Sequence, residues 1–221
     1  MLLAYRSAHY CAAFLITVVL CATNANAAWQ TPLTEQDVAS LSARAIAQYR
    51  ISNRSSADLK TGFTLDVEVL MVELQEKKSR EPNAPRLAEV FIYDYSTNRA
   101  SRQLIDTVSH ELVSTHPITN IHLPLNQRER ALAVQILLSN DDLLSELTNE
   151  YVEQFGQPLA TLAQLDMKVS IWEPGVSDID TGNCKQTRCA LVSVFTQEHY
   201  NFSVEPVVEL QNAIVYLDLV Q

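Results

Sequence analysis

The spacing of apolar residues predicts a helix near the start of the chain. From Glu35 to about Tyr49, apolar side chains recur every three or four residues, as on the buried face of an amphipathic helix. Thr34 precedes this segment and Asp37 lies three residues later, so the two can cap the helix start reciprocally. The buried face is expected to consist of Val38, Leu41, Ala45, Ile46 and Tyr49.

The segment that follows changes to a period of two, which predicts strands. A turn at Ser96-Thr97-Asn98 and a break near Ser109 and His110 divide these strands. The expected strands cover 63–71, 86–95, 100–107 and 111–118. A helix packed on an antiparallel sheet of this kind is a cystatin-like α+β unit.

The second half of the chain repeats the order of helix and then sheet. Asn126 with Glu129 three residues later predicts a helix start. Ser139 with Asp142 repeats that spacing, so two helices broken near Asn140 are expected. The second helix is expected to bury Leu143, Leu144, Leu147, Tyr151, Val152 and Phe155, and to end at Gly156 and Pro158. Strands are expected over 162–172, 190–197 and 212–219.

These patterns predict an α+β protein of two tandem cystatin-like modules, 28–120 and 121–221. Residues 1–27 instead have the pattern of a cleaved secretory signal: Arg6, an apolar run, and the small-x-small site Ala25-Asn26-Ala27. The apolar run is shorter than the roughly 20 residues that a membrane span needs. A retained anchor or a lipid on Cys21 is therefore the weaker interpretation. The mature chain is expected to be periplasmic or secreted, without membrane contact.

Once residues 1–27 are removed, Cys184 and Cys189 are the remaining cysteines. A pair in an exported protein most simply forms a local disulfide. A metal or redox pair is the alternative, although such pairs usually have C-x-x-C spacing and further ligands nearby. Cross-linking so short a loop stabilises a protein by only about 2–3 kcal/mol, so the expected role of the bond is local order at a hairpin tip.

Charge and motifs exclude several classes of function. The formal net charge is −10 and no basic block is present, so nucleic acid is not an expected partner. The chain has four glycines and no G-x-G pair, which argues against a phosphate-binding loop. Ser109, His110 and Glu111 are neighbours in sequence and would point to alternating sides of a strand, so they do not form a catalytic relay. No catalytic or cofactor-binding residue is assigned.

Several segments resemble the small N-terminal domains, N2 and N3, of copper amine oxidases. They are Thr31-Pro32-Leu33-Thr34, Arg86-Leu87-Ala88-Glu89-Val90 with Tyr93-Asp94, Pro124-Leu125, and Glu205-Pro206-Val207-Val208-Glu209-Leu210 before a strand ending in Leu217-Asp218-Leu219. In that family the two small domains resemble each other and cystatin. Copper, held by three histidines, and the tyrosine-derived topaquinone belong to a large C-terminal domain, which is expected to be absent here. The resemblance therefore implies no cofactor in this chain, and amine oxidation only with a separate catalytic chain.

Two groups of residues could be mistaken for a redox or metal site. Ile92-Tyr93-Asp94-Tyr95 is similar to the family's quinone motif, but Ile92 replaces its asparagine, so Tyr93 is interpreted as an ordinary strand aromatic. His110, His116 and His122 recur at intervals of six and are the candidate metal ligands. A metal requires that imidazoles converge on it, and a turn beside a proline-broken segment does not ensure this. Surface histidines are the favoured interpretation.

The leading hypothesis is an exported, non-catalytic protein-interaction module whose partner is another protein. Its contact surfaces are expected to be exposed strand edges and the loop from Asp178 to Arg188, because sheet edges recruit partners. Two alternatives remain open. The chain could be an accessory part of a copper- and quinone-dependent primary amine oxidase system, or a periplasmic metal-binding protein that uses the three histidines.

Overall fold

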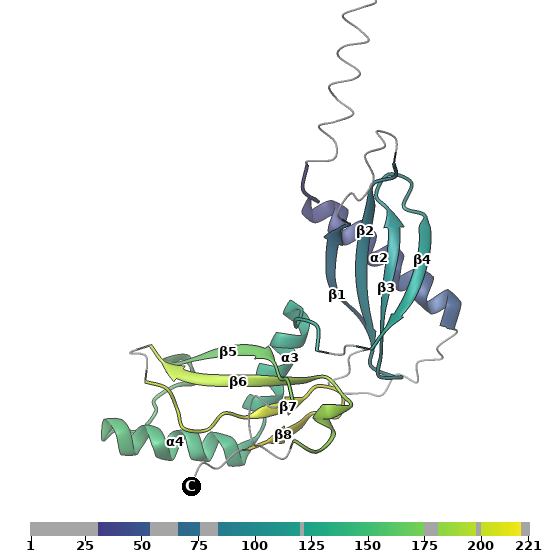
Figure 1. Cartoon of the computed structure of the whole chain (residues 1–221). Coiled ribbons are helices and arrows are strands. Elements are labelled where there is room, and N and C mark those ends of the chain that lie inside the picture. Colours follow the sequence, from purple (N-terminus) through teal and green to yellow (C-terminus); the bar gives the residue numbers. More distant parts are fainter. Residues whose placement is uncertain are drawn as a thin grey trace, which may run out of the picture.

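The structure is a computed structural model that describes residues 31–53, 66–75, 84–119, 122–174, 181–197 and 200–217. The predicted signal sequence lies outside these residues. Two four-stranded antiparallel sheets and several helices make up the fold, which confirms the α+β class (Figure 1). The first sheet contains β1 (Val67–Leu74), β2 (Leu87–Asp94), β3 (Arg99–Asp106) and β4 (Leu112–Ile118). The second contains β5 (Leu165–Ile171), β6 (Cys189–Thr196), β7 (Val207–Glu209) and β8 (Ile214–Tyr216). In both sheets the strands are adjacent in sequence order.

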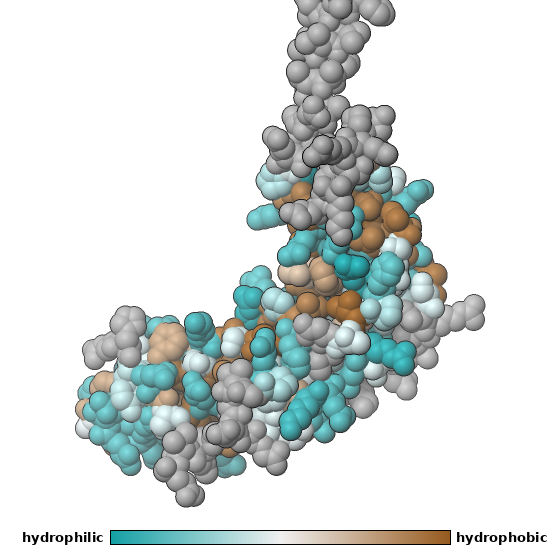
Figure 2. Space-filling view, in the orientation of Figure 1, coloured by the Kyte–Doolittle hydropathy of each residue, from teal (hydrophilic) through white to brown (hydrophobic). Residues whose placement is uncertain are grey.

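Helix α2 (Glu35–Asn53) covers one face of the first sheet. Its predicted cap is confirmed: the Thr34 amide donates to Asp37 Oδ2 at 2.9 Å, and the Asp37 amide donates to Thr34 Oγ1 at 3.2 Å. The buried side chains against this face are Leu41, Ala45 and Tyr49 from the helix and Val67, Ala88, Val90, Ile92 and Ile105 from the strands. Figure 2 shows hydrophobic residues among hydrophilic ones over the opposite face of this sheet.

Helices α3 (Gln127–Leu138) and α4 (Asp141–Phe155) pack on the second sheet, and the predicted break between them is confirmed. The residue that caps α4 differs from the prediction. Asn140 Oδ1 accepts from the Leu143 amide at 2.9 Å, whereas the Ser139 hydroxyl donates back to the carbonyl of Ile136 at 2.7 Å. Ser139 therefore completes α3 and does not begin α4. Gly156 ends α4 with a φ of 68°, a left-handed conformation that favours glycine.

The predicted buried face of α4 is correct at its centre and wrong at Val152. Leu143, Leu147 and Tyr151 are buried, while Val152 is 41% exposed. Val152 follows Tyr151 directly, and one residue turns the helix by about 100°, which carries its side chain away from the sheet. Leu144 and Phe155 are half-buried at the margins of this face.

Strand β7 was not predicted, and two other strands are shorter than expected. Residues 162–164 form a 3-10 turn (η1, Leu162–Gln164) ahead of β5. Of the strand expected over 212–219, only β8 is observed, and 218–219 lie outside the described residues. Strand β7 pairs with both β6 and β8 although it has only three residues. Three residues are too few to display a period of two, so the pattern could not identify it.

The buried cluster beneath α3 and α4 continues into the first sheet. Its members from the first sheet are Leu70, Tyr93, Tyr95 and Ala100. They belong to a different cluster from the side chains that pack against α2, and Tyr95 contacts Glu129 in the first turn of α3. The two sheets therefore share one apolar core at the point where they meet. This junction also holds the buried ion pair of Glu129 and Arg188, which is described below.

Candidate functional site

Arg188 is the largest fully buried side chain at the junction of the two sheets. It immediately precedes β6, and its guanidinium reaches back to the segment before α3. Nε donates to Glu129 Oε1 at 2.8 Å and Nη2 donates to Glu129 Oε2 at 3.1 Å. The same guanidinium bonds the carbonyl oxygens of Leu123 at 2.9 Å and Pro124 at 3.2 Å. These acceptors satisfy the planar, multi-donor geometry of an arginine that is removed from water.

Glu129 joins three structural elements with one carboxylate. As the third residue of α3 it completes the predicted capping box: Oε2 accepts from the Asn126 amide at 2.7 Å, and Asn126 Oδ1 accepts from the Glu129 amide at 2.8 Å. The carboxylate also binds Arg188 and accepts the hydroxyl hydrogen bond of Tyr95, which follows β2. Neither side chain of the ion pair is exposed. Breaking such a buried pair is far more costly than losing a surface one.

The first sheet contributes aromatic and backbone contacts to the same junction. Tyr93 and Tyr95 pack edge to face with ring centroids 4.8 Å apart, and the Arg188 guanidinium carbon lies 5.3 Å from the Tyr93 ring centroid. Asn126 Nδ2 also donates to the backbone carbonyl of Val69 in β1 at 2.9 Å. The residue that caps α3 thus binds the edge of the first sheet as well.

The electrostatics of the junction favour a charged Arg188 guanidinium and a neutral Tyr95 phenol. Burial alone would lower the pKa of Arg188, but the Glu129 carboxylate beside it raises that pKa above its ordinary value. Burial, with a further contribution from the Glu129 charge, strongly raises the pKa of Tyr95. At neutral pH the Arg188 guanidinium therefore stays charged and the Tyr95 phenol stays protonated. A group held in this way is poorly suited to accept or release a proton during a reaction.

Two buried tyrosines should resist alkaline titration. Burial raises the pKa of Tyr49 and of Tyr93 from 10.0 to about 12, and a hydrogen bond to Asp94 adds to the effect at Tyr49. Because the folded pKa lies above the unfolded one, this stabilisation is full below pH 10 and is lost as the pH rises toward 12. We expect ultraviolet titration of phenolate to show these two groups protonated in the folded protein above pH 10. The protein unfolded in denaturant serves as the control. Identical titration curves for the two states would contradict the burial that we describe.

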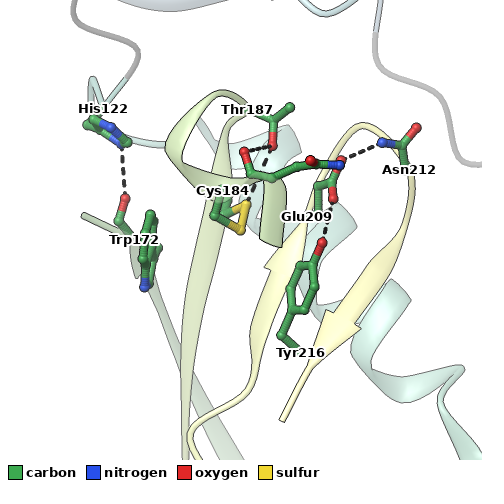
Figure 3. The surroundings of a disulfide bond; sticks show 9 residues. His122, Trp172, Cys184, Thr187, Glu209, Asn212 and Tyr216 are labelled. Atoms are coloured by element: carbon green, nitrogen blue, oxygen red, sulfur yellow. Dashed lines mark hydrogen bonds between the residues drawn. A yellow bond between two sulfur atoms is a disulfide. The ribbon is translucent and has the colours of Figure 1, made fainter. Parts of the chain in front are cut away.

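Cys184 and Cys189 form the predicted disulfide, in the connection between β5 and β6, with Cα atoms 5.5 Å apart (Figure 3). Both sulfurs lie in a small buried cluster with Trp172 and Val207. Thr187 Oγ1 donates to the carbonyl of Asn183 at 3.1 Å and so closes the same loop. Arg188 lies between Thr187 and Cys189. The disulfide therefore orders the loop that positions Arg188 at the junction.

The disulfide loop rests against the last described strand. Gly182 has a φ of 53°, and a Cβ added there would lie 3.1 Å from the Tyr216 hydroxyl oxygen. Tyr216 donates to Glu209 Oε2 at 2.9 Å, and Asn212 donates to Glu209 Oε1 (Figure 3). Glu209 is fully buried and is satisfied by these neighbours. Glycine at 182 permits this close approach of the loop to Tyr216.

The three candidate metal-binding histidines occupy different structural elements. His110 lies in the turn after β3 with a φ of 57°, and its carbonyl accepts from Arg44 Nε at 3.3 Å. His116 is on β4, with Nε2 3.0 Å from Ser114 Oγ. His122 precedes α3, with Nδ1 3.1 Å from the carbonyl oxygen of Trp172 (Figure 3). Among the described residues, no group of three or more histidine, cysteine, aspartate or glutamate side chains converges as a metal site.

The sequence identified parts of this junction but not their association. Glu129 was recognised as a capping residue and Tyr93 as a strand aromatic, and both do occupy these positions. For Arg188 the sequence predicts only a place at the end of the contact loop. Its partner Glu129 is 59 residues away in sequence, so no local pattern could connect them. Asp178, the other end of the predicted contact loop, lies outside the described residues.

No protein-family model matches the chain, and no curated protein matches it in sequence. A solved structure of a copper-containing benzylamine oxidase from Hansenula polymorpha is similar, with a TM-score of 0.43 and 10% sequence identity. The match covers 78% of this chain and 28% of the oxidase chain.

Within the described residues, no helix is long and apolar enough to cross a membrane.

Proposed function

We propose that this protein is an exported, non-catalytic interaction module made of two tandem cystatin-like modules, 28–120 and 121–221, that resemble the N2 and N3 domains of copper amine oxidases. The observation that supports a non-catalytic role is that the buried charged groups of the junction are hydrogen-bonded to other groups of the same chain. The carboxylate of Glu129 and the guanidinium of Arg188 bind each other and neighbouring groups of the chain itself. A catalytic carboxylate or arginine needs an open side toward a substrate. Copper and topaquinone would enter only with a separate catalytic chain.

The surface that we assign to partner binding is the tip of the disulfide loop. Asn183, Lys185 and Gln186 are exposed, whereas Cys184, Thr187 and Arg188 are buried and fix the loop from beneath. A loop that is ordered before binding loses less conformational freedom when a partner docks. The junction thus supports function indirectly, because it holds the base of the loop in place.

Affinity capture from the protein's own cell envelope tests this proposal. The tagged mature chain is compared with the loop variant Asn183→Ala/Lys185→Ala/Gln186→Ala and with a matched control, Asn149→Ala/Glu153→Ala/Gln154→Ala, which alters exposed positions on α4. We expect mass spectrometry to identify a protein that the native chain and the control retain and the loop variant does not. Equal retention by all three would contradict the assignment of the loop.

The non-catalytic part of the proposal has its own test. The purified mature chain is incubated with primary amines, with and without added Cu²⁺, and release of hydrogen peroxide is measured. A second assay measures ester hydrolysis. No turnover is expected in either assay. Turnover that disappears when a single residue such as Tyr93 is changed to phenylalanine would overturn the proposal.

A further inference from the structure

The edge strands of the two sheets differ in how open they are. Strand β1 has a bulge between Val69 and Met71, and the Val69 carbonyl is already bonded to Asn126. Strand β4 has a register shift opposite Leu104 and contains Pro117, which has no N–H to donate. Strand β8 has three residues. Bulges, prolines, charged side chains and short length are the usual features that prevent edge strands from pairing with other chains.

Strand β5 has no bulge and no proline, and its two charged side chains, Asp166 and Lys168, are of opposite sign. Its seven residues pair with β6 from Leu165 to Ile171 without a shift in register. It forms one edge of the second sheet, and among the described residues no strand pairs with its other side (Figure 1). The strand is long enough to support a further strand of similar length.

The direction in which the backbone groups of β5 point follows from its observed pairing with β6. The Trp172 amide donates to the carbonyl of Cys189 at 2.9 Å, which is the inward hydrogen bond at the end of β5. In antiparallel strands the hydrogen-bonding direction alternates from residue to residue. The backbone groups of Asp166, Lys168 and Ser170 therefore point to β6, and those of Met167, Val169 and Ile171 point to the open edge.

The side chains of β5 alternate in the same way between two surfaces. Met167, Val169 and Ile171 are half-buried and pack against the core beneath the helices. Asp166, Lys168 and Ser170 are exposed on the opposite face. Opposite charges thus stand two residues apart on one exposed face, on either side of Met167. This pattern becomes self-complementary when the strand is paired antiparallel to itself.

We propose that two copies of this chain associate through β5, antiparallel, about a two-fold axis at Met167. In this register Asp166 of each copy lies opposite Lys168 of the other, so two oppositely charged cross-strand pairs form. Leu165 lies opposite Val169 on the core side. Two-fold self-association of this kind requires only one surface patch. The sheet β5-β6-β7-β8 of one copy and the same sheet of the other copy then form one continuous sheet.

Charge complementarity favours both the pairing register and the proposed partner, a second copy of this chain. A two-fold axis at Lys168 would place two lysines opposite each other, which is unfavourable. An axis at Val169 would place Lys168 opposite Ser170 and leave both charges unpaired. The axes at Met167 and Val169 both make the central pair hydrogen-bonded, because the backbone groups of both residues face outward. Of these two, only the axis at Met167 also pairs Asp166 with Lys168. The proposed dimer edge and the proposed partner-binding loop involve different residues, so each can be tested without the other.

Charge reversal tests the dimer without disturbing the fold, because Asp166 and Lys168 are exposed. Sedimentation equilibrium of the mature chain should show a monomer–dimer equilibrium. In a dimer of the Lys168→Asp variant, both cross-strand pairs between positions 166 and 168 consist of two acidic residues. In a dimer of the Asp166→Lys variant, both pairs consist of two basic residues. Each single variant should weaken dimerisation by about tenfold or more. The double variant Asp166→Lys/Lys168→Asp restores both opposite pairs and should dimerise like the native chain.

Mixing the two single variants gives the sharpest outcome. Lys168→Asp carries two acidic residues at these positions and Asp166→Lys carries two basic ones, so together they should form a heterodimer. Circular dichroism checks that each variant is folded. A native chain that stays monomeric at concentrations of about 100 μM, well above the Kd expected for a specific dimer, would overturn the proposal. So would a dimer that neither single reversal weakens.

Discussion

Replacing Arg188 by methionine should lower the free energy of unfolding by about 3–5 kcal/mol. The variant leaves the Glu129 carboxylate buried without its cation, and it leaves the carbonyl oxygens of Leu123 and Pro124 without the donors that Arg188 supplies. Methionine fills a similar volume with an apolar side chain. The loss of stability therefore reflects the unpaired charge of Glu129 more than the formation of a cavity. Urea unfolding followed by circular dichroism measures the change.

The matched control for this prediction is Arg50→Met. Arg50 pairs with Asp66 at 2.7 Å, but the two side chains are 54% and 38% exposed, so the loss should not exceed about 1 kcal/mol. The double variant Glu129→Met/Arg188→Met should lose less than the sum of the two single losses, since no isolated charge remains. If Arg188→Met costs no more than Arg50→Met, the junction does not stabilise the protein in the way that we describe.

Replacing Trp172 by alanine should cost about 3–5 kcal/mol of stability and expose the disulfide to reductant. The indole is 2% exposed and packs in the cluster that buries Cys184, Cys189 and Val207. Thiol–disulfide exchange requires that a thiolate reach a sulfur, and the native packing prevents this. Denaturant unfolding gives the stability, and the rate of thiol release in dithiothreitol gives the accessibility.

Trp172→Phe is the matched variant, because it retains an aromatic ring over the sulfurs. It should lose less stability than Trp172→Ala and should be reduced more slowly. Val152→Ala, at an exposed position on α4, should change neither quantity. Equal reduction rates for the native protein and Trp172→Ala would show that other residues shield the disulfide.

Local sequence patterns predicted most of the fold where a rule acts over a few residues. The caps at Thr34 and Asn126 and the helix end at Gly156 depend on hydrogen bonds or on a backbone conformation within one turn. The first sheet was predicted strand by strand, because its strands of seven or eight residues are long enough to show alternation. Its first strand, Val67–Leu74, extends past the expected end at residue 71, and residues 63–65 of the expected strand lie outside the described residues.

The junction could not be predicted in the same way, because its contacts connect distant segments. Tyr95 and Glu129 are 34 residues apart, and Glu129 and Arg188 are 59 apart. A glutamate at the third position of a helix is fully explained by capping, so nothing in its surroundings indicates a second role. An arginine beside a cysteine likewise gives no sign of burial. Charged residues are usually exposed, and an exception depends on partners that only the folded chain brings together.

The three roles of Glu129 constrain how this protein can diverge. One carboxylate begins α3, neutralises Arg188 and accepts from Tyr95, so a substitution at any of these three positions changes the surroundings of the other two. Relatives that have lost the ion pair should therefore carry replacements at 95, 129 and 188 together, with apolar side chains in place of the charges. The same reasoning applies to recombination. A chimera that joins this first half to a foreign second half near residue 120 would contain Tyr95 but not the carboxylate that accepts its hydrogen bond. Grafts that carry all three positions from one parent should express and fold better than grafts that divide them.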